Sequence, residues 1–126
     1  MQIKALGYEL TVCKIKSFHS DIVKNGFYFL SQTDEELSLV CETENTPPDT
    51  TDREDGWKAF RIEGVLDFSL VGILAPIASL LADARIGIFA VSTYNTDYVL
   101  VKKENYDAAL DLLAKNGYTI VKQQNK

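Results

Sequence analysis

The sequence predicts an α+β protein with a ferredoxin-like arrangement, and the second half of the chain carries that prediction. Strand-like and helix-like stretches follow one another there in the order strand, helix, strand, strand, helix, strand. A helix between two parallel strands crosses over right-handedly and covers one face of the sheet. Two such units on one face of a four-stranded antiparallel sheet make the ferredoxin-like fold. Hydrophobic residues at 46% and charged residues at 25% are ordinary for a globular domain.

Six stretches of the second half make up this order. They are strands over 57–66, 87–94, 98–102 and 118–122, a helix from about Leu70 or Gly72 to Ala84, and a helix over 104–116. The second helix has four apolar residues on one face, and Asn116-Gly117 ends it. These four residues are Tyr106, Ala109, Leu110 and Leu113. In the first helix Pro76 removes a hydrogen bond, so the regular helix is expected to begin late or to bend there.

The first half predicts a shortened version of the same unit, although its residues show no sequence repeat. Strands are expected over 8–15, 27–30 and 37–42, with one or two helical turns within 17–25. The last two strands flank a polar turn at 32–36 and predict a hairpin. Residues 45–56 contain Pro47-Pro48 and many acids, which favours a linker. The expected division is therefore a first module with an acidic linker over 1–56 and a second module over 57–126.

Charge and hydropathy exclude several classes of partner. The formal net charge of -5 gives no general attraction to nucleic acid or to anionic lipid. The start of the chain lacks the pattern of a signal peptide, and the apolar run 71–82 is too short to span a bilayer. We therefore expect no nucleic-acid or membrane partner and a cytoplasmic location. Cys13 and Cys41 are expected to be unpaired thiols in strands, because they have no metal-ligand or redox spacing.

Residues for catalysis do not form any familiar group. His19 is the sole histidine and has no second base near it in the sequence. The sequence contains no phosphate-binding glycine loop, no helix with paired metal-ligand histidines and no plausible nucleophile–base pair. The aromatic run 27–29 lacks interleaved Lys or Arg, which favours a sheet core over stacking with nucleic-acid bases. The sequence thus predicts no enzyme, no catalytic residue, no metal site and no cofactor.

Three segments carry a more specific signal. They read Leu-Asp-Phe-Ser-Leu-Val-Gly-Ile-Leu at 66–74, Ile-Phe-Ala-Val-Ser-Thr-Tyr-Asn-Thr-Asp-Tyr-Val-Leu-Val at 88–101, and Phe-Leu-Ser-Gln-Thr at 29–33 leading to Glu-Glu-Leu-Ser-Leu-Val-Cys at 35–41. With these segments the chain closely resembles, over about 8–118, the bacterial ACT proteins related to the CASTOR arginine sensors. The resemblance implies two tandem ACT-like modules, the first of them shortened. It also implies a regulatory role without catalysis and a pocket for a small ligand, such as an amino acid, where one module meets another.

Carried over residue by residue, the pocket uses the turn before the first helix and the hairpin after it. The implied ligand-binding residues are Asp67, Ser69, Leu70, Val71, Gly72, Ile73, Thr93, Tyr94 and Asp97. Gly72 at a helix N-terminus lets a carboxylate approach unpaired backbone N–H groups, and Asp97 supplies a carboxylate for an ammonium group. Leu70 stands where the arginine sensors present an acid, so the resemblance does not imply arginine specificity.

Each of these residues also has a purely structural interpretation. Ser69 can be a helix N-cap, Asp97 can stabilise the turn 95–97, and Gly72 can relieve crowding between helix and sheet. The alternative function is a structural or protein–protein interaction module with a vestigial pocket. The CASTOR-like architecture has four modules in one chain, whereas this chain has two. A homodimer is therefore expected to restore the missing half around a two-fold axis.

Overall fold

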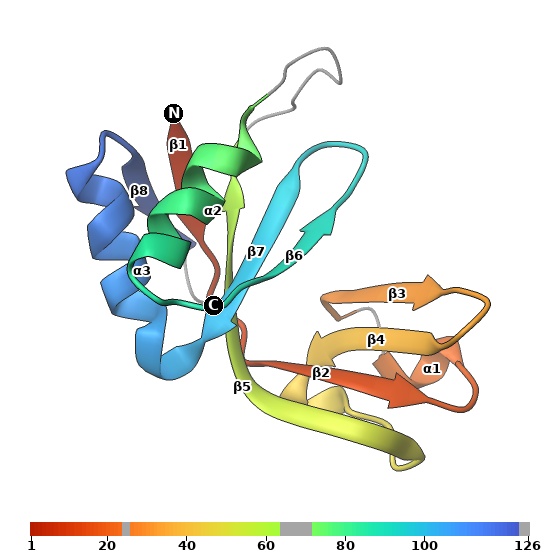
Figure 1. Cartoon of the computed structure of the whole chain (residues 1–126). Helices are drawn as coiled ribbons and strands as arrows, with labels where there is room; N and C mark the ends of the chain where they lie inside the picture. Colours follow the sequence, from red (N-terminus) through yellow and green to blue (C-terminus); the bar gives the residue numbers. More distant parts are fainter. Residues whose placement is uncertain (24–25, 64–71, 124–126) are drawn as a thin grey trace. The chain divides into compact units, whose positions relative to one another are not determined.

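The computed structural model of the chain describes residues 1–23, 26–63 and 72–123 and divides into two compact units (Figure 1). The larger unit contains residues 1–7 and the described residues from Lys58 onward, and the smaller unit contains residues 8–57. The long strand β5 (Thr50–Ile62) contributes residues to both units. These units differ from the division expected from the sequence, because the first strand of the chain belongs to the larger unit rather than to the first module.

The larger unit has an α+β, ferredoxin-like order of elements. Its strands are β1 (Gln2–Ala5), the end of β5, β6 (Phe89–Ser92), β7 (Asp97–Lys102) and β8 (Thr119–Lys122), and its helices are α2 (Leu74–Asp83) and α3 (Lys103–Lys115). In the sheet, β7 lies between β6 and β5, and β1 lies between β5 and β8. β1 pairs with β5 in the antiparallel direction and with β8 in the parallel direction. It therefore lies between β5 and β8, which are the first and the last strand of the order predicted for the second half of the chain.

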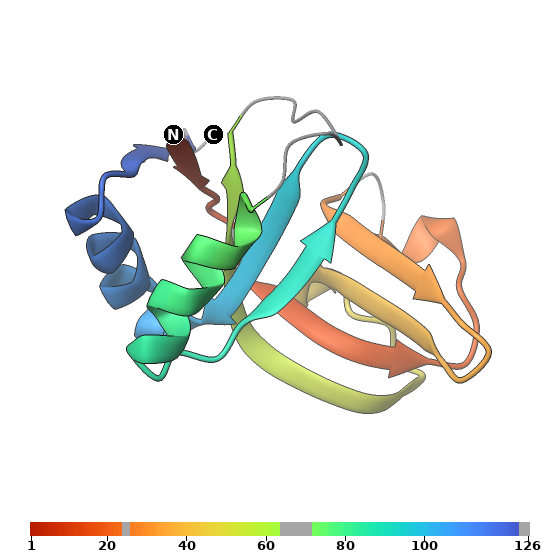
Figure 2. The ribbon, with the colours of Figure 1, turned by 45° about the horizontal axis from the view of Figure 1, so that its top comes forward.

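Both helices of the larger unit cover the same face of its sheet (Figure 2). Together with the strands they form a cluster of buried side chains, and the predicted amphipathic face of α3 is confirmed because all four of its residues belong to it. The members are Ile3, Ala5, Phe60, Ile62, Ile77, Leu81, Ile86, Val99, Val101, Tyr106, Ala109, Leu110 and Leu113. The Tyr106 hydroxyl donates to the Ala59 carbonyl at 2.7 Å and lies 3.3 Å from that of Leu6. This contact ties α3 to β5 and to the segment after β1.

Local chemistry explains where these helices begin and end. α2 begins at Leu74, which places Pro76 in the first turn, where a backbone N–H has no partner within the helix in any case. The late start expected from Pro76 is thus confirmed. α3 ends at Lys115, and Gly117 has a φ of 95°. This left-handed conformation is the cap expected from Asn116-Gly117, because glycine adopts it without a steric cost.

The smaller unit is a four-stranded antiparallel sheet with little helix. It contains β2 (Leu10–Ile15), α1 (Ser20–Val23), β3 (Tyr28–Gln32), β4 (Leu37–Glu42), the single-turn 3-10 helix η1 (Thr43–Asn45) and the first part of β5. The strand order is β3-β4-β2-β5, and the hairpin predicted around the turn 32–36 is confirmed. A small buried cluster lies between the sheet and α1. Its members are Cys13, Ile15, Val23, Leu39 and Cys41.

The acidic linker predicted over 45–56 is wrong from Thr50 onward, because these residues belong to strand β5. They pair antiparallel with β2, and their side chains are mostly exposed. Strand pairing is decided by the partner as much as by local composition, since β2 supplies the backbone hydrogen bonds. The charges also have partners within the strand: Arg53 forms an ion pair with Asp55 at 2.8 Å.

The hairpins β3–β4 and β6–β7 have the same register at a separation of 60 positions. Every described residue pair of β6–β7 corresponds to a pair of β3–β4 when 60 is subtracted from both numbers. Their turns agree as well: the Thr33 N–H donates to the Glu36 carbonyl and the Thr93 N–H donates to the Thr96 carbonyl, both at 2.9 Å. The two hairpins therefore repeat the same backbone geometry, although few of their equivalent residues are identical.

Candidate functional site

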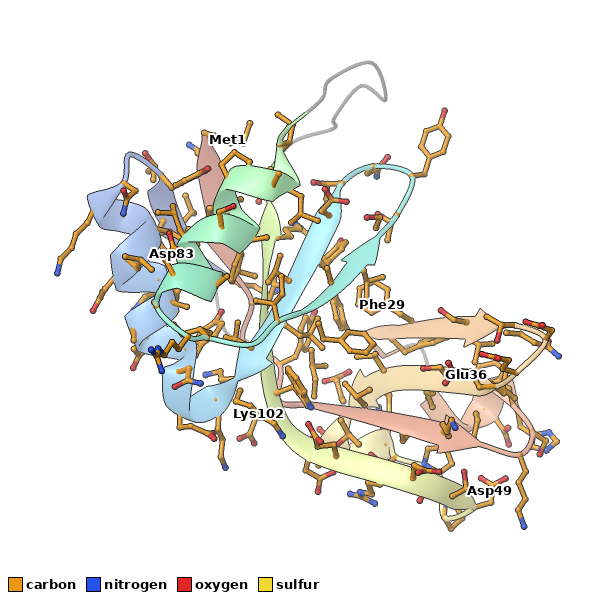
Figure 3. The ribbon with its side chains drawn as sticks, in the orientation of Figure 1. Met1, Phe29, Glu36, Asp49, Asp83 and Lys102 are labelled. Atoms are coloured by element: carbon orange, nitrogen blue, oxygen red, sulfur yellow. The ribbon has the colours of Figure 1, made fainter. Side chains whose placement is uncertain are left out.

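The described candidate residues gather at one end of the larger unit's sheet. β5 ends there, the chain leads from there to α2, and the β6–β7 hairpin turns there (Figures 1 and 2). The buried Thr96 hydroxyl donates to the Ile62 carbonyl at 2.7 Å, so the hairpin turn is bonded to the last residue of β5. The other end of this unit is marked by Asp83 at the end of α2 and Lys102 at the end of β7 (Figure 3).

Asp97 is the first residue of β7 rather than part of the turn that the sequence predicts. It lies directly opposite Ser92, the last residue of β6, and the Ser92 hydroxyl donates to its carboxylate at 2.6 Å. Its side chain is half-buried, so one carboxylate oxygen is held in place while the group remains accessible. Sequence reasoning missed Ser92, although a hairpin register that places it opposite Asp97 is the signal that would have found it.

Thr93 and Tyr94 lie in the turn itself. The Thr93 hydroxyl donates to the Thr96 carbonyl at 2.9 Å and closes the turn together with the backbone. The hydroxyl proton of Thr93 therefore serves the turn in this structure. The Tyr94 side chain is 79% exposed, the largest exposure among the large hydrophobic side chains of the described residues. An aromatic side chain with this exposure, next to a polar turn, has the surface needed to contact a small ligand.

Gly72 and Ile73 immediately precede α2. Gly72 has a φ of 73°, and a Cβ at this position would meet nothing within 4 Å among the described residues. Glycine is needed there for the left-handed backbone rather than to relieve crowding between helix and sheet. Ile73 occupies the N-cap position and its side chain makes no capping hydrogen bond. The N–H groups of the first turn of α2 therefore have no side-chain cap from this position.

Four of the candidates, Asp67, Ser69, Leu70 and Val71, lie outside the described residues.

A second carboxylate stands at the same end of the sheet and was missed by sequence reasoning. Glu63 directly follows β5, and its Oε2 atom is buried without a hydrogen-bond partner among the described residues. Its nearest charge is Arg61, whose Nε lies 3.7 Å from that oxygen. Burial opposes the charge on Arg61, but a hydrogen bond from its guanidinium to the Tyr98 hydroxyl and the charge of Glu63 together raise the pKa of Arg61. Tyr98, Arg61 and Glu63 thus interact in sequence, and the Glu63 carboxylate lies beside the permanent positive charge of Arg61.

The described residues give no other signal of metal or membrane chemistry. Within 1–23, 26–63 and 72–123, no group of three or more His, Cys, Asp or Glu side chains is placed to hold a metal ion. None of the helices in these ranges is long and apolar enough to cross a membrane.

The fold and the position of these residues define a ferredoxin-like α+β protein. The sequence profile of the ACT domain matches residues 52–115. The chain belongs to the ACT-domain family.

Several known proteins are similar to this chain in sequence or in structure. The cytosolic arginine sensor for mTORC1 subunit 1 of Homo sapiens is 31% identical over 96 residues, covering 71% of this chain. This chain spans only 29% of the length of that sensor, and 30% of its counterpart in Bos taurus. The crystal structure of protein Atu0741 from Agrobacterium tumefaciens has a TM-score of 0.87 at 29% identity, covering 98% of this chain and 94% of that chain. Aspartate kinase from Synechocystis has the same fold over 99% of this chain and 28% of its own, with a TM-score of 0.68 at 13% identity.

Proposed function

We propose that this chain is a non-catalytic regulatory protein that binds an amino acid at the end of the larger unit's sheet where β5 ends. The observation that carries the proposal is the buried hydrogen bond between Thr96 and Ile62, which joins the β6–β7 hairpin to the end of β5. This bond holds Asp97 at the end of the sheet from which the chain leads to α2. Membership in the ACT family, and the likeness to a protein named as an arginine sensor, support a regulatory role.

The two charged groups of an amino acid find complementary partners at this end of the sheet. The N–H groups in the first turn of α2, which Ile73 does not cap, can donate to the ligand carboxylate, and the left-handed backbone at Gly72 allows it to approach closely. Asp97 can accept from the ligand ammonium in a charge-assisted bond of about 1.5–3 kcal/mol. Glu63 adds a second carboxylate that is already partly desolvated. Tyr94 and Ile73 supply apolar surface for the ligand side chain. An apolar or small side chain fits this proposal as well as that of arginine.

A structural or protein–protein interaction module with a vestigial pocket is the second candidate, and one contact favours it. The Ser92 hydroxyl at 2.6 Å satisfies part of the Asp97 carboxylate without any ligand. In this second function Asp97 only fixes the start of β7. The two candidates therefore differ in whether removing the charge of Asp97 affects a ligand or only the fold.

A thermal-shift panel of free amino acids separates the two candidates. A ligand at about 100 times its dissociation constant adds about 2.7 kcal/mol to the free energy of unfolding, which raises the melting temperature. Asp97→Asn keeps an oxygen for Ser92 but removes the charge, so it should weaken binding more than it weakens folding. Asp34→Asn, in the turn of the smaller unit's hairpin, is the matched control and should leave the affinity unchanged. If no amino acid shifts the melting temperature, or if Asp97→Asn lowers stability while affinity stays intact, the vestigial-pocket candidate wins.

We further propose that the chain is a two-module member of the CASTOR-like bacterial ACT proteins and acts as a cytoplasmic homodimer. Residues 8–57 would then be the shortened ACT-like module, which the matching hairpins support. A second copy would supply the modules that the longer arginine sensors carry in one chain. Light scattering at micromolar concentration tests the dimer. The expected mass is twice the 14.1 kDa of one chain, and a monomer mass with and without amino acids would exclude it.

A further inference from the structure

The smaller unit contains two thiols on neighbouring strands that no ligand-binding role uses. Cys13 of β2 lies opposite Leu39 of β4, and Cys41 lies opposite Thr11, so the two cysteines are diagonal neighbours on one face of the sheet. Both are free thiols in the same buried cluster, with exposures of 3% and 0%. Their contact with each other distinguishes them from isolated buried cysteines, which behave as inert small hydrophobes.

The surroundings make the two thiols chemically different. The Cys13 thiol donates to the Leu39 carbonyl at 3.5 Å, and the Cys41 sulfur lies 3.7 Å from the Thr46 hydroxyl. The contact with Cys41 raises the pKa of Cys13, and burial raises it further. The same contact lowers the pKa of Cys41 to about 7, against the opposing effect of burial. The directions of these pKa shifts favour Cys41 as the nucleophilic thiolate and Cys13 as the thiol that keeps its proton.

We propose that Cys13 and Cys41 form a reversible intramolecular disulfide when the chain meets a hydroperoxide. The Cys41 thiolate attacks one peroxide oxygen, the O–O bond breaks, and Cys41 becomes a sulfenic acid while hydroxide leaves. Cys13 then attacks the Cys41 sulfur, an S–S bond forms and a second hydroxide leaves. The two thiol protons neutralise the two hydroxides, so two thiols and one hydrogen peroxide give one disulfide and two waters. The sulfurs are oxidised by two electrons in total, and the peroxide is reduced by two.

The buried position of the pair favours a disulfide over other products of the same thiols. A disulfide is uncharged and suits the apolar cluster, whereas a sulfinate or a metal-bound thiolate places a charge there at a high desolvation cost. Oxidation needs only a small oxidant and local opening, and a unit with a small buried cluster opens more readily than a large core.

The geometry also indicates that the bond is easily reduced. Diagonal neighbours in an antiparallel sheet have Cα atoms about 7–8 Å apart, whereas an unstrained disulfide needs about 4.4–6.8 Å. β2 is irregular on both sides of Cys13 in its pairing with β5, and bulges of this kind locally disrupt the pairing and bend the strand. A bond formed with strain has a more oxidising potential, as reversible regulatory disulfides do. The bond would link β2 to β4 and enclose α1 and β3, so the stability of the smaller unit would depend on the redox state.

The test treats the folded full-length chain with hydrogen peroxide and measures intact mass, thiol content and linked peptides. We expect a mass loss of about 2 Da, one peptide pair joined through Cys13 and Cys41, and full recovery with a dithiol reductant. A parallel sample in urea shows whether the reaction belongs to the folded chain. Oxygen adducts without the loss of mass, two unreacted thiols, disulfides only between chains, or a link that forms only in urea would each overturn the proposal.

A single-cysteine variant and a labelling experiment test the assigned roles. In Cys13→Ala, the sulfenic acid on Cys41 has no partner and should accumulate, where a dimedone-type probe traps it. In the unsubstituted chain, where the contact between the thiols is intact, limited alkylation at about pH 7 should label Cys41 at least tenfold faster than Cys13. Equal labelling, or faster labelling of Cys13, contradicts the assignment of Cys41 as the attacking thiol. If Cys13→Ala prevents folding, the peptide map and the time course of the unsubstituted chain decide the question alone.

Discussion

The two compact units use the same hairpin but differ in the helix after it. The hairpins β3–β4 and β6–β7 agree in register and turn at a separation of 60 positions. The next helix along the chain has 13 residues in the larger unit and only a single turn, η1, in the smaller one. Both begin one residue after the preceding strand, and the sequences start alike, with Glu44-Asn45 matching Glu104-Asn105. The units therefore diverge at one point rather than throughout.

Two prolines explain the divergence. After η1 the smaller unit continues with Thr46-Pro47-Pro48, and Thr46 has an extended backbone with ψ of 126°. The residue before a proline is disfavoured in helical conformation, and proline lacks the N–H that the helix needs. At the equivalent place the larger unit has Tyr106, which turns its ring into the core and continues α3. A local stop signal of two residues thus leaves the smaller unit without a helix equivalent to α3.

Because the smaller unit has no helix equivalent to α3, we expect it to be less stable than the larger unit. The larger unit buries side chains from two helices and three strands in one cluster, whereas the cluster of the smaller unit contains five buried residues. Apolar burial is the main favourable term in folding, so we expect the smaller unit to open first. Substitutions in each unit can test this difference.

The largest effect is expected for Phe60→Ala in the larger unit. Phe60 is fully buried in the cluster beneath both helices. Removing its ring leaves a cavity and should lower the free energy of unfolding by about 3–5 kcal/mol. Urea unfolding measures this loss, and Asp111→Ala on the exposed side of α3 is the control, expected within about 0.5 kcal/mol of the unsubstituted chain. A loss below about 1 kcal/mol for Phe60→Ala would mean that this core is loosely packed.

Leu39→Ala in the smaller unit should cost about 2–5 kcal/mol locally, because Leu39 is fully buried in the cluster that contains both thiols. Hydrogen exchange shows where the loss falls. Amides of β2 and β4 should lose protection, whereas those paired between β1 and β8 should keep theirs if the units open separately. An equal loss at all four strands would show that the two units unfold as one cooperative structure.

Tyr106 gives the larger unit a pH dependence that the smaller unit lacks at the equivalent Thr46. Burial raises the pKa of Tyr106 from 10.0 to about 12, and the residue is only 5% exposed. The fold favours the neutral phenol, so its contribution is complete below pH 10 and is lost as the pH rises from about 10 to about 12. The stability of the unsubstituted chain should fall across this window by up to about 2–3 kcal/mol more than that of Tyr106→Phe. Parallel pH curves from urea unfolding would contradict this.

The smallest and most closely matched effect concerns the two turn threonines. Thr33 accepts hydrogen bonds from the backbone N–H groups of Glu35 and Glu36, and Thr93 donates to the carbonyl of Thr96. Thr33→Val and Thr93→Val should each cost about 0.5–1.5 kcal/mol in chemical unfolding. Under the proposed function only Thr93→Val should also weaken amino-acid binding. If Thr33→Val weakens binding equally, the site does not belong to the larger unit alone.

The sequence by itself determined the elements whose signals are local. Spacing and turn chemistry within a few residues predict the apolar face of α3, its end at Asn116-Gly117 and both hairpins. Pro76 likewise predicts the late start of α2. The resemblance to ACT proteins, rather than these local signals, implied the candidate residues Gly72, Thr93 and Asp97, and the structure brings the elements that carry them to one end of a sheet. Topology alone accounts for this, because β5 and the hairpin turn meet at that end.

Tertiary structure alone decided the features that depend on a distant partner. β1 inserts between β5 and β8, and the acidic residues from Thr50 onward become a strand because β2 pairs with them. The Ser92–Asp97 bond depends on which residues face each other across a hairpin, and the contact between Cys13 and Cys41 depends on the pairing of two strands. Backbone hydrogen bonds between strands carry no local periodicity that names the partner, so these pairings appear only when the chain is folded.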